Sequence, residues 1–152
     1  MDNPVQSHEV IITGRFPHPI ERVFRAWSTP QHIECWLKPE SQCRANVVRF
    51  DFREGGEYHL HYSWDAGTHS VHGKFLTIVP EKSVIFSWTT LPPDPYAGRE
   101  TMVSVWFRSL SSDLTEVELR HTLFPDQVMR DCHNFGWSAA FALLTQHLQA
   151  GR

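Results

Sequence analysis

The sequence predicts an α+β domain in which one antiparallel sheet is covered by a single long helix near the C-terminal end. Two patterns carry this prediction. From Cys43 to Phe124, apolar residues recur at every second position between turn signals, which is typical of six consecutive strands. From Gln127 to Gln149, apolar residues recur near i, i+3, i+4 spacing, which indicates one amphipathic helix. This helix is the expected cover for the apolar face of the sheet.

The residues before this region predict one strand and two short helices. Residues 7–16 are rich in β-branched side chains and predict the strand, whereas residues 17–28 place apolar side chains at helical spacing. In the next segment Thr29 is a candidate N-cap, and Pro30 stands at the first helical position. Asp126 is a candidate cap for the long helix. We therefore expect a single domain over residues 1–152.

Composition and charge exclude several classes of function. The net charge is only -3 and the 14 Lys and Arg residues are scattered, so no surface for nucleic acid is indicated. No apolar run approaches the roughly 20 residues of a membrane span, and no export signal is visible. Cys35, Cys43 and Cys132 form no C-x-x-C pair, which argues against disulfides and thiolate zinc. We expect a cytoplasmic protein with no cofactor and no membrane insertion.

Four of the ten histidines lie in one predicted hairpin. If residues 66–67 form its tip, His61 faces His72 and His59 faces Lys74. His61 and His72 could then chelate a metal ion, with His59 as a third ligand. No carboxylate is placed to orient the imidazoles, and Lys74 would repel a cation. The favoured interpretation is therefore the solvent-facing side of a hairpin, with the metal site as the alternative.

The other side of the predicted strands is apolar and rich in aromatic residues. Side-chain alternation turns His121 inward together with several large rings, of which the most polar are Tyr58, Tyr62, Trp64 and Trp88. The covering helix adds Trp137. Polar tips of buried Tyr and Trp need hydrogen-bond partners, which favours a pocket between helix and sheet for an apolar ligand with one polar handle. A solid aromatic core is the alternative.

Five segments, taken together and in order, resemble the bacterial AHSA-like proteins, which are homologues of the activator of the heat-shock ATPase. This group belongs to the START-like, Bet v-like helix-grip superfamily, also called SRPBCC. The most specific features are the double glycine at 55–56 before a strand and the Gly136-Trp137 pair in the last helix. The matching segments are residues 17–37, 50–62, 73–88, 115–125 and 133–148.

The resemblance implies a helix-grip fold, in which a curved sheet of about seven strands wraps a long C-terminal helix around an internal cavity, with two short helices after strand 1. Members of the superfamily bind lipids, sterols, hormones or polyketides in that cavity, and some are cyclases. The positions that match cavity lining are Trp36, Tyr62, Trp64, Phe86, Trp88, His121, Trp137 and Phe141. We add His133 to these candidate ligand-binding residues.

Three functions are compatible with these patterns. The first is binding of a small, mostly hydrophobic molecule, oriented by His121 or Tyr62, with the proline-rich loop 91–100 as a lid. The second is a cyclase or hydrolase with His121 or His133 as general base. Asp51 and Glu100 are the inward-facing carboxylates considered for orienting the base, although no nucleophile motif is present.

The third function is protein interaction, either as a co-chaperone or by self-association of the strand surface into a homodimer. The resemblance implies a role related to chaperones and the stress response. However, the eukaryotic activator has a separate N-terminal domain with a Trp-His-Trp-type segment, and this sequence contains neither. We therefore do not expect chaperone activation.

Overall fold

The computed structural model describes residues 8–151, and within them the chain forms seven strands and three helices in the predicted order. Asp126 caps the long helix as expected, because its carboxylate accepts a hydrogen bond from the Met129 backbone N–H at 2.9 Å. Thr29 occupies the N-cap position of the second short helix without a side-chain capping bond. The elements are β1 (Val10–Phe16), α1 (Ile20–Ser28), α2 (Pro30–Trp36), β2 (Arg44–Phe50), β3 (Glu57–Trp64), β4 (Gly67–Val79), β5 (Ser83–Thr90), β6 (Glu100–Ser111), β7 (Leu114–Thr122) and α3 (Gln127–Gln149).

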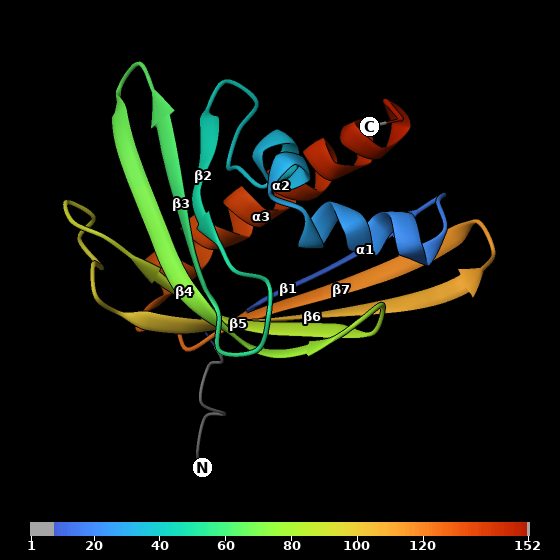
Figure 1. The fold of residues 1–152 in the computed structure, drawn as a ribbon. Coiled ribbons are helices and arrows are strands. Elements are labelled where there is room, and N and C mark those ends of the chain that lie inside the picture. The colour runs from blue at the N-terminus through green and yellow to red at the C-terminus, as the bar shows by residue number, and fades with distance from the viewer. Residues whose placement is uncertain (1–7, 152) are drawn as a thin grey trace, which may run out of the picture.

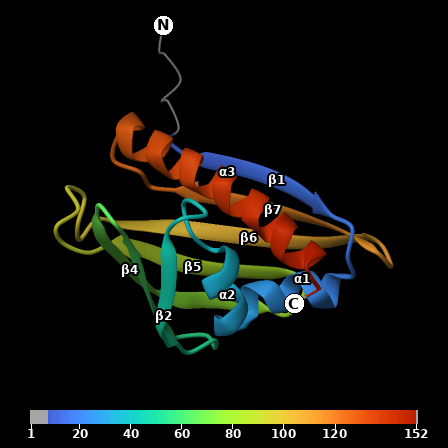
Figure 2. The same ribbon diagram turned by 90° about the horizontal axis from the view of Figure 1, so that it is seen from above.

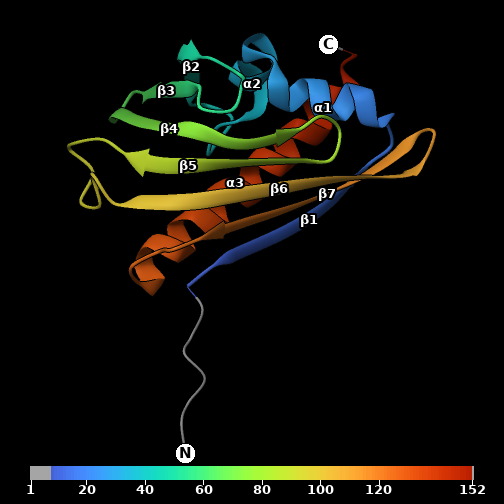
Figure 3. The same cartoon turned by 60° about the horizontal axis from the view of Figure 1, so that its bottom comes forward.

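The strands form one antiparallel sheet in the order β1-β7-β6-β5-β4-β3-β2. The sheet is strongly curved, and all three helices lie on its concave side (Figure 1). Seen from above, α3 runs obliquely along β1 and β7, while α1 and α2 lie beside its C-terminal half (Figure 2). Figure 3 shows the strands in spatial order, with β1 and β2 at opposite edges. This arrangement is the helix-grip fold. No helix in the described residues is long and apolar enough to cross a membrane.

The register of the β3–β4 hairpin differs from the prediction by two residues. Trp64 pairs with Gly67, so the turn is Asp65-Ala66. A shift of two keeps every side chain on its predicted face, and for this reason the alternating pattern could not distinguish the two registers. His59 consequently faces His72, and His61 faces Ser70.

The observed register removes the predicted pairing of His61 with His72 and places His72 opposite His59 instead. His61 Nδ1 is hydrogen-bonded to the Ser70 hydroxyl at 2.7 Å and is not opposite His72. Among residues 8–151, no group of three or more His, Cys, Asp or Glu side chains is arranged to hold a metal ion. The geometry on which the metal alternative depended is therefore wrong.

The double glycine before β3 is required by backbone geometry. Gly55 has φ +85°, in the left-handed region that residues with a Cβ rarely adopt. At Gly56 a Cβ would lie 2.0 Å from the Asp51 carbonyl oxygen, which excludes any side chain. This tight loop sets the start of β3 and thereby the inward alternation of Tyr58, Leu60 and Tyr62.

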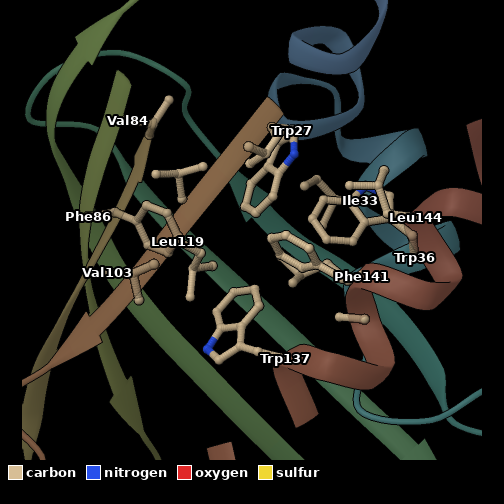
Figure 4. Packing of buried hydrophobic residues seen from close by; sticks show 14 of the residues in the cluster. Trp27, Ile33, Trp36, Val84, Phe86, Val103, Leu119, Trp137, Phe141 and Leu144 are labelled. Carbon is tan, nitrogen blue, oxygen red and sulfur yellow. The ribbon is translucent and has the colours of Figure 1, made fainter. Parts of the chain in front are cut away.

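One half of the space between α3 and the sheet is filled by aromatic side chains (Figure 4). Trp36 is fully buried, and its indole N–H donates to the Ala26 carbonyl at 2.9 Å. Trp27 packs edge-on against Trp36, with ring centroids 4.5 Å apart, and Phe141 packs against both Trp27 and Phe16. The interior is therefore not one continuous void. The larger space that remains lies toward the N-terminal half of α3.

Candidate functional site

A cavity of about 200 Å³ opens between the N-terminal half of α3, strands β3 to β5 and the segment that follows α2. An apolar cavity of about 150 Å³ is large enough to hold benzene, whereas pockets for drug-sized ligands span roughly 300–1,000 Å³. The volume therefore fits a single-ring molecule whose substituents reach the mouth. Its apolar walls are Leu37, Tyr62, Val71, Trp88, Trp137 and Ala140.

The structure brings four of the predicted site residues together around this cavity and leaves the others outside it. Tyr62, Trp88, His133 and Trp137 line the cavity. Phe86 borders a separate, smaller space of about 20 Å³ deeper in the core.

The remaining predicted residues have other surroundings. Trp36 and Phe141 belong to the filled aromatic half of the interior. Trp64 lies at the end of β3 with 37% of its surface exposed and does not line the cavity. His121 is inward, as predicted by alternation, but it is 0% exposed and lies behind Trp137.

His121 uses both ring nitrogens in hydrogen bonds within the core. The Trp137 indole N–H donates to Nδ1 at 3.0 Å, and Nε2–H donates to the Thr101 hydroxyl oxygen at 2.7 Å. The Thr101 hydroxyl donates in turn to the Trp88 carbonyl at 2.8 Å. Burial holds the pKa of His121 well below its ordinary value, and nearby His133 acts in the same direction. His121 is thus a neutral, fully satisfied core histidine and has no free nitrogen to act as a base.

His133 has a similar arrangement on the cavity wall. Its Nε2 accepts the indole N–H of Trp88 at 3.2 Å, and its Nδ1–H donates to the Met129 carbonyl at 2.9 Å. Burial lowers the pKa of His133, and the carbonyl of Met129 partly opposes this effect. Both nitrogens are engaged, so His133 orients the Trp88 ring and does not offer a proton acceptor to the cavity.

Tyr62 also directs its polar tip into the protein. Its hydroxyl donates to the Leu37 carbonyl at the end of α2, at 2.9 Å. Burial raises the pKa of this phenol, and Cys43 acts in the same direction. Tyr62 therefore joins β3 to α2 and contributes the face of its ring to the cavity.

The polar groups that remain at the cavity form a rim, and sequence reasoning did not propose them as site residues. They are Lys38 after α2, His69 on β4, Asp94 in the loop between β5 and β6, and Cys132 on α3. Alternation turned His69 inward, which was a usable signal. No sequence signal indicated that the side chain of Asp94 points to the cavity, because an irregular loop has no periodicity from which to infer side-chain direction.

The two carboxylates considered from the sequence lie elsewhere. Asp51 pairs with Arg53, with 2.8 Å between the carboxylate and Nε. Glu100 is exposed at the start of β6, beside His59 and His72 on the other face of the sheet. Neither lines the cavity, so the acid group at this site is Asp94.

Gly136 lies at the cavity within α3, and its lack of a side chain is not dictated by crowding. A Cβ added there would meet only the Pro39 Cβ, at an ordinary contact distance of 3.7 Å. Glycine inside a helix costs roughly 0.5–1 kcal/mol relative to alanine. We therefore expect Gly136→Ala to raise the free energy of unfolding by about 0.5–1 kcal/mol in urea titrations. A loss of stability would show that the helix needs the glycine for packing.

The fold and the cavity define a helix-grip domain with a small site between α3 and the sheet. The sequence profile of the family described as "Activator of Hsp90 ATPase homolog 1-like protein" matches residues 17–149, and the chain belongs to this family. No curated protein sequence matches the chain.

Solved structures of similar fold come from several bacteria. A protein from Chromobacterium violaceum is 21% identical with a TM-score of 0.82, over 91% of this chain and 95% of that one. An AHSA1 protein from Silicibacter pomeroyi is 21% identical with a TM-score of 0.83, over 95% and 99%. CalU16 from Micromonospora echinospora is 23% identical with a TM-score of 0.67, over 91% and 74%. At these identities the likeness establishes the fold alone.

Proposed function

We propose that this protein binds a small, mainly apolar, single-ring molecule in the cavity between α3 and strands β3 to β5. The observation that carries the proposal is a cavity of about 200 Å³ with tryptophan, tyrosine and aliphatic walls and polar groups gathered at its rim. Such a site stabilises the ligand by removing apolar surface from water, while the rim receives one polar substituent.

The hydrogen bonds of the two histidines considered as general bases favour binding over catalysis. His121 and His133 both have their two ring nitrogens committed to partners in the protein. A general base needs a nitrogen within hydrogen-bond reach of its substrate. The aromatic groups of the cavity wall are also held by these bonds, so the site is preorganised and little side-chain entropy is lost on binding.

We expect single-ring apolar compounds to raise the melting temperature. A ligand that binds only the folded state at one hundred times its Kd stabilises it by about 2.7 kcal/mol, which corresponds to roughly 5–10 °C for a domain of this size. Differential scanning fluorimetry of a library of substituted benzenes checks this. No shift with any member, in protein shown to be folded, would contradict the proposal.

A pair of variants at Gly136 makes the test specific for the cavity. Gly136→Leu projects a branched side chain at the cavity and should weaken binding by at least about tenfold, since it occupies the volume of several ligand atoms. Gly136→Ala adds one methyl group and should keep most of the affinity. Equal binding by both variants would place the ligand elsewhere on the molecule.

A further inference from the structure

At the cavity rim, His69 lies beside Asp94, and no internal hydrogen bond among residues 8–151 engages the His69 ring or the Oδ2 oxygen of Asp94. The two carboxylate oxygens of Asp94 have different neighbours. Oδ1 accepts the Tyr96 backbone N–H at 2.7 Å and the Thr90 hydroxyl at 3.3 Å. Oδ2 lies 3.6 Å from Nδ1 of His69. The loop is held to the N-terminus of α3 by a hydrogen bond from the Tyr96 hydroxyl to Asp126 at 3.0 Å, which restrains the neighbouring Asp94.

At 3.6 Å the contact between the Asp94 carboxylate and His69 is electrostatic, and it favours one tautomer of the imidazole. A carboxylate beside Nδ1 favours the proton on Nδ1, which leaves Nε2 with its lone pair. Burial lowers the pKa of His69, and Asp94 only partly opposes this, so the ring is neutral. The imidazole stacks almost parallel to Tyr62, with an interplanar angle of 15°, which fixes its plane. Within residues 8–151 no hydrogen bond engages Nε2.

We propose that His69 Nε2, held in its acceptor form by Asp94, binds the hydroxyl proton of a phenol-like ligand. The inference rests on the proposed function and narrows it from an apolar ring to an aromatic alcohol. Asp94 is the other acceptor at the rim, and its free oxygen Oδ2 faces Nδ1 of His69. The remaining polar groups are weaker candidates. Lys38 is a donor only, Cys132 bonds weakly, and both nitrogens of His133 are engaged.

The experiment compares a hydroxyl donor with a carbonyl acceptor of similar size. Affinities for 4-methylphenol and acetophenone are measured by NMR titration, and their ratio is the readout. The native protein should favour the phenol by about threefold to tenfold, the range that one net hydrogen bond supplies.

Asp94→Asn should reverse this preference without changing the shape of the site. Asparagine Oδ1 keeps the bonds from Tyr96 and Thr90, and its NH₂ group replaces Oδ2 beside His69. Nδ1 of His69 must then accept, so Nε2 becomes an N–H donor, as in the wrong tautomer produced when asparagine replaces the aspartate of a serine-protease triad. Acetophenone should now bind better, and the affinity ratio should change by about tenfold or more.

Three further variants separate His69 from its neighbours. Asp113→Asn makes the same charge change in the exposed β6–β7 turn and should leave the ratio unchanged. His69→Phe keeps a flat ring and should bring the ratio close to one; a retained preference for phenol would mean that Asp94 accepts the hydroxyl directly and would overturn the assignment. Lys38→Met should not change the ratio if His69 is the contact.

The outcomes distinguish this inference from the function on which it rests. An Asp94→Asn protein with a native-like NMR spectrum and an unchanged ratio overturns the inference. If Asp94→Asn does not fold, the affinity ratio measured with His69→Phe decides whether His69 is the contact. Equal binding of phenol and ketone by the native protein overturns the inference and leaves the proposed function intact. Binding of neither compound, nor of ethylbenzene, overturns both.

Discussion

Replacing Trp137 by alanine should lower the free energy of unfolding by about 3–5 kcal/mol, because the change empties the volume of a nearly buried indole. The ring is only 3% exposed and stacks on Trp27, with centroids 6.4 Å apart and an interplanar angle of 16°. Its loss also leaves Nδ1 of His121 without its donor. Small domains are stable by only about 5–15 kcal/mol in total, so this variant should be close to the limit of folding.

Two companion variants separate packing from hydrogen bonding. Trp137→Phe keeps most of the ring but removes the indole N–H, and should cost about 1–3 kcal/mol because His121 retains a buried, unpaired acceptor. Phe135→Ala on the same helix removes a ring that is 75% exposed and should stay within about 0.5 kcal/mol of the native value. Urea unfolding followed by circular dichroism measures all three. Equal stability of the alanine and phenylalanine variants would contradict the account.

Acidification should destabilise the protein through His121. In the unfolded chain this residue binds a proton near its ordinary pKa of 6.5, whereas burial holds the pKa far lower in the folded state. Below pH 6.5 the unfolded state therefore binds more protons than the folded state, and stability falls as the pH falls. The contribution of one such histidine is about 1.4 kcal/mol per pH unit, or roughly 2 kcal/mol between pH 6.5 and pH 5.

The contribution of His121 is isolated by comparison with His121→Gln, which keeps a polar group in the position but does not titrate. The difference in stability between native protein and variant should shrink by about 1.4 kcal/mol for each pH unit below 6.5. His133 and the other histidines with lowered pKa are present in both proteins, so their contributions cancel. Parallel curves of stability against pH would show that His121 is protonated in the folded state, contrary to its hydrogen bonds.

The fold was predictable because periodicity and capping are local. The alternating segments became β2 to β7, the helical pattern became α3, and the cap at Asp126 and the glycines at 55–56 took their expected roles. The hairpin register was not predictable, since a two-residue shift buries the same apolar face. Only the residues of the turn could distinguish the two registers, and the Asp65-Ala66-Gly67 sequence is compatible with a turn at 65–66 or at 66–67.

The site was predictable only where it is built from regular elements. Alternation turned Tyr62, Trp88 and His121 inward, and helical spacing placed Trp137 on the same side of α3. The pairwise bonds that commit His121 and His133 to tryptophan partners join residues far apart in the chain, and periodicity contains no information about them. The same limit applies to Asp94, whose direction depends on the conformation of an irregular loop.

The tryptophans offer the most direct test of whether the cavity holds a ligand. The chain has six indole N–H groups, each of which gives one resolved signal in a nitrogen-correlated NMR spectrum. Trp88 and Trp137 line the cavity, whereas Trp64 and Trp106 are exposed outside it. On titration with 4-methylphenol, the signals of Trp88 and Trp137 should move together in a saturable way while those of Trp64 and Trp106 stay in place. Movement confined to the exposed pair, or no movement at millimolar ligand, would contradict the account.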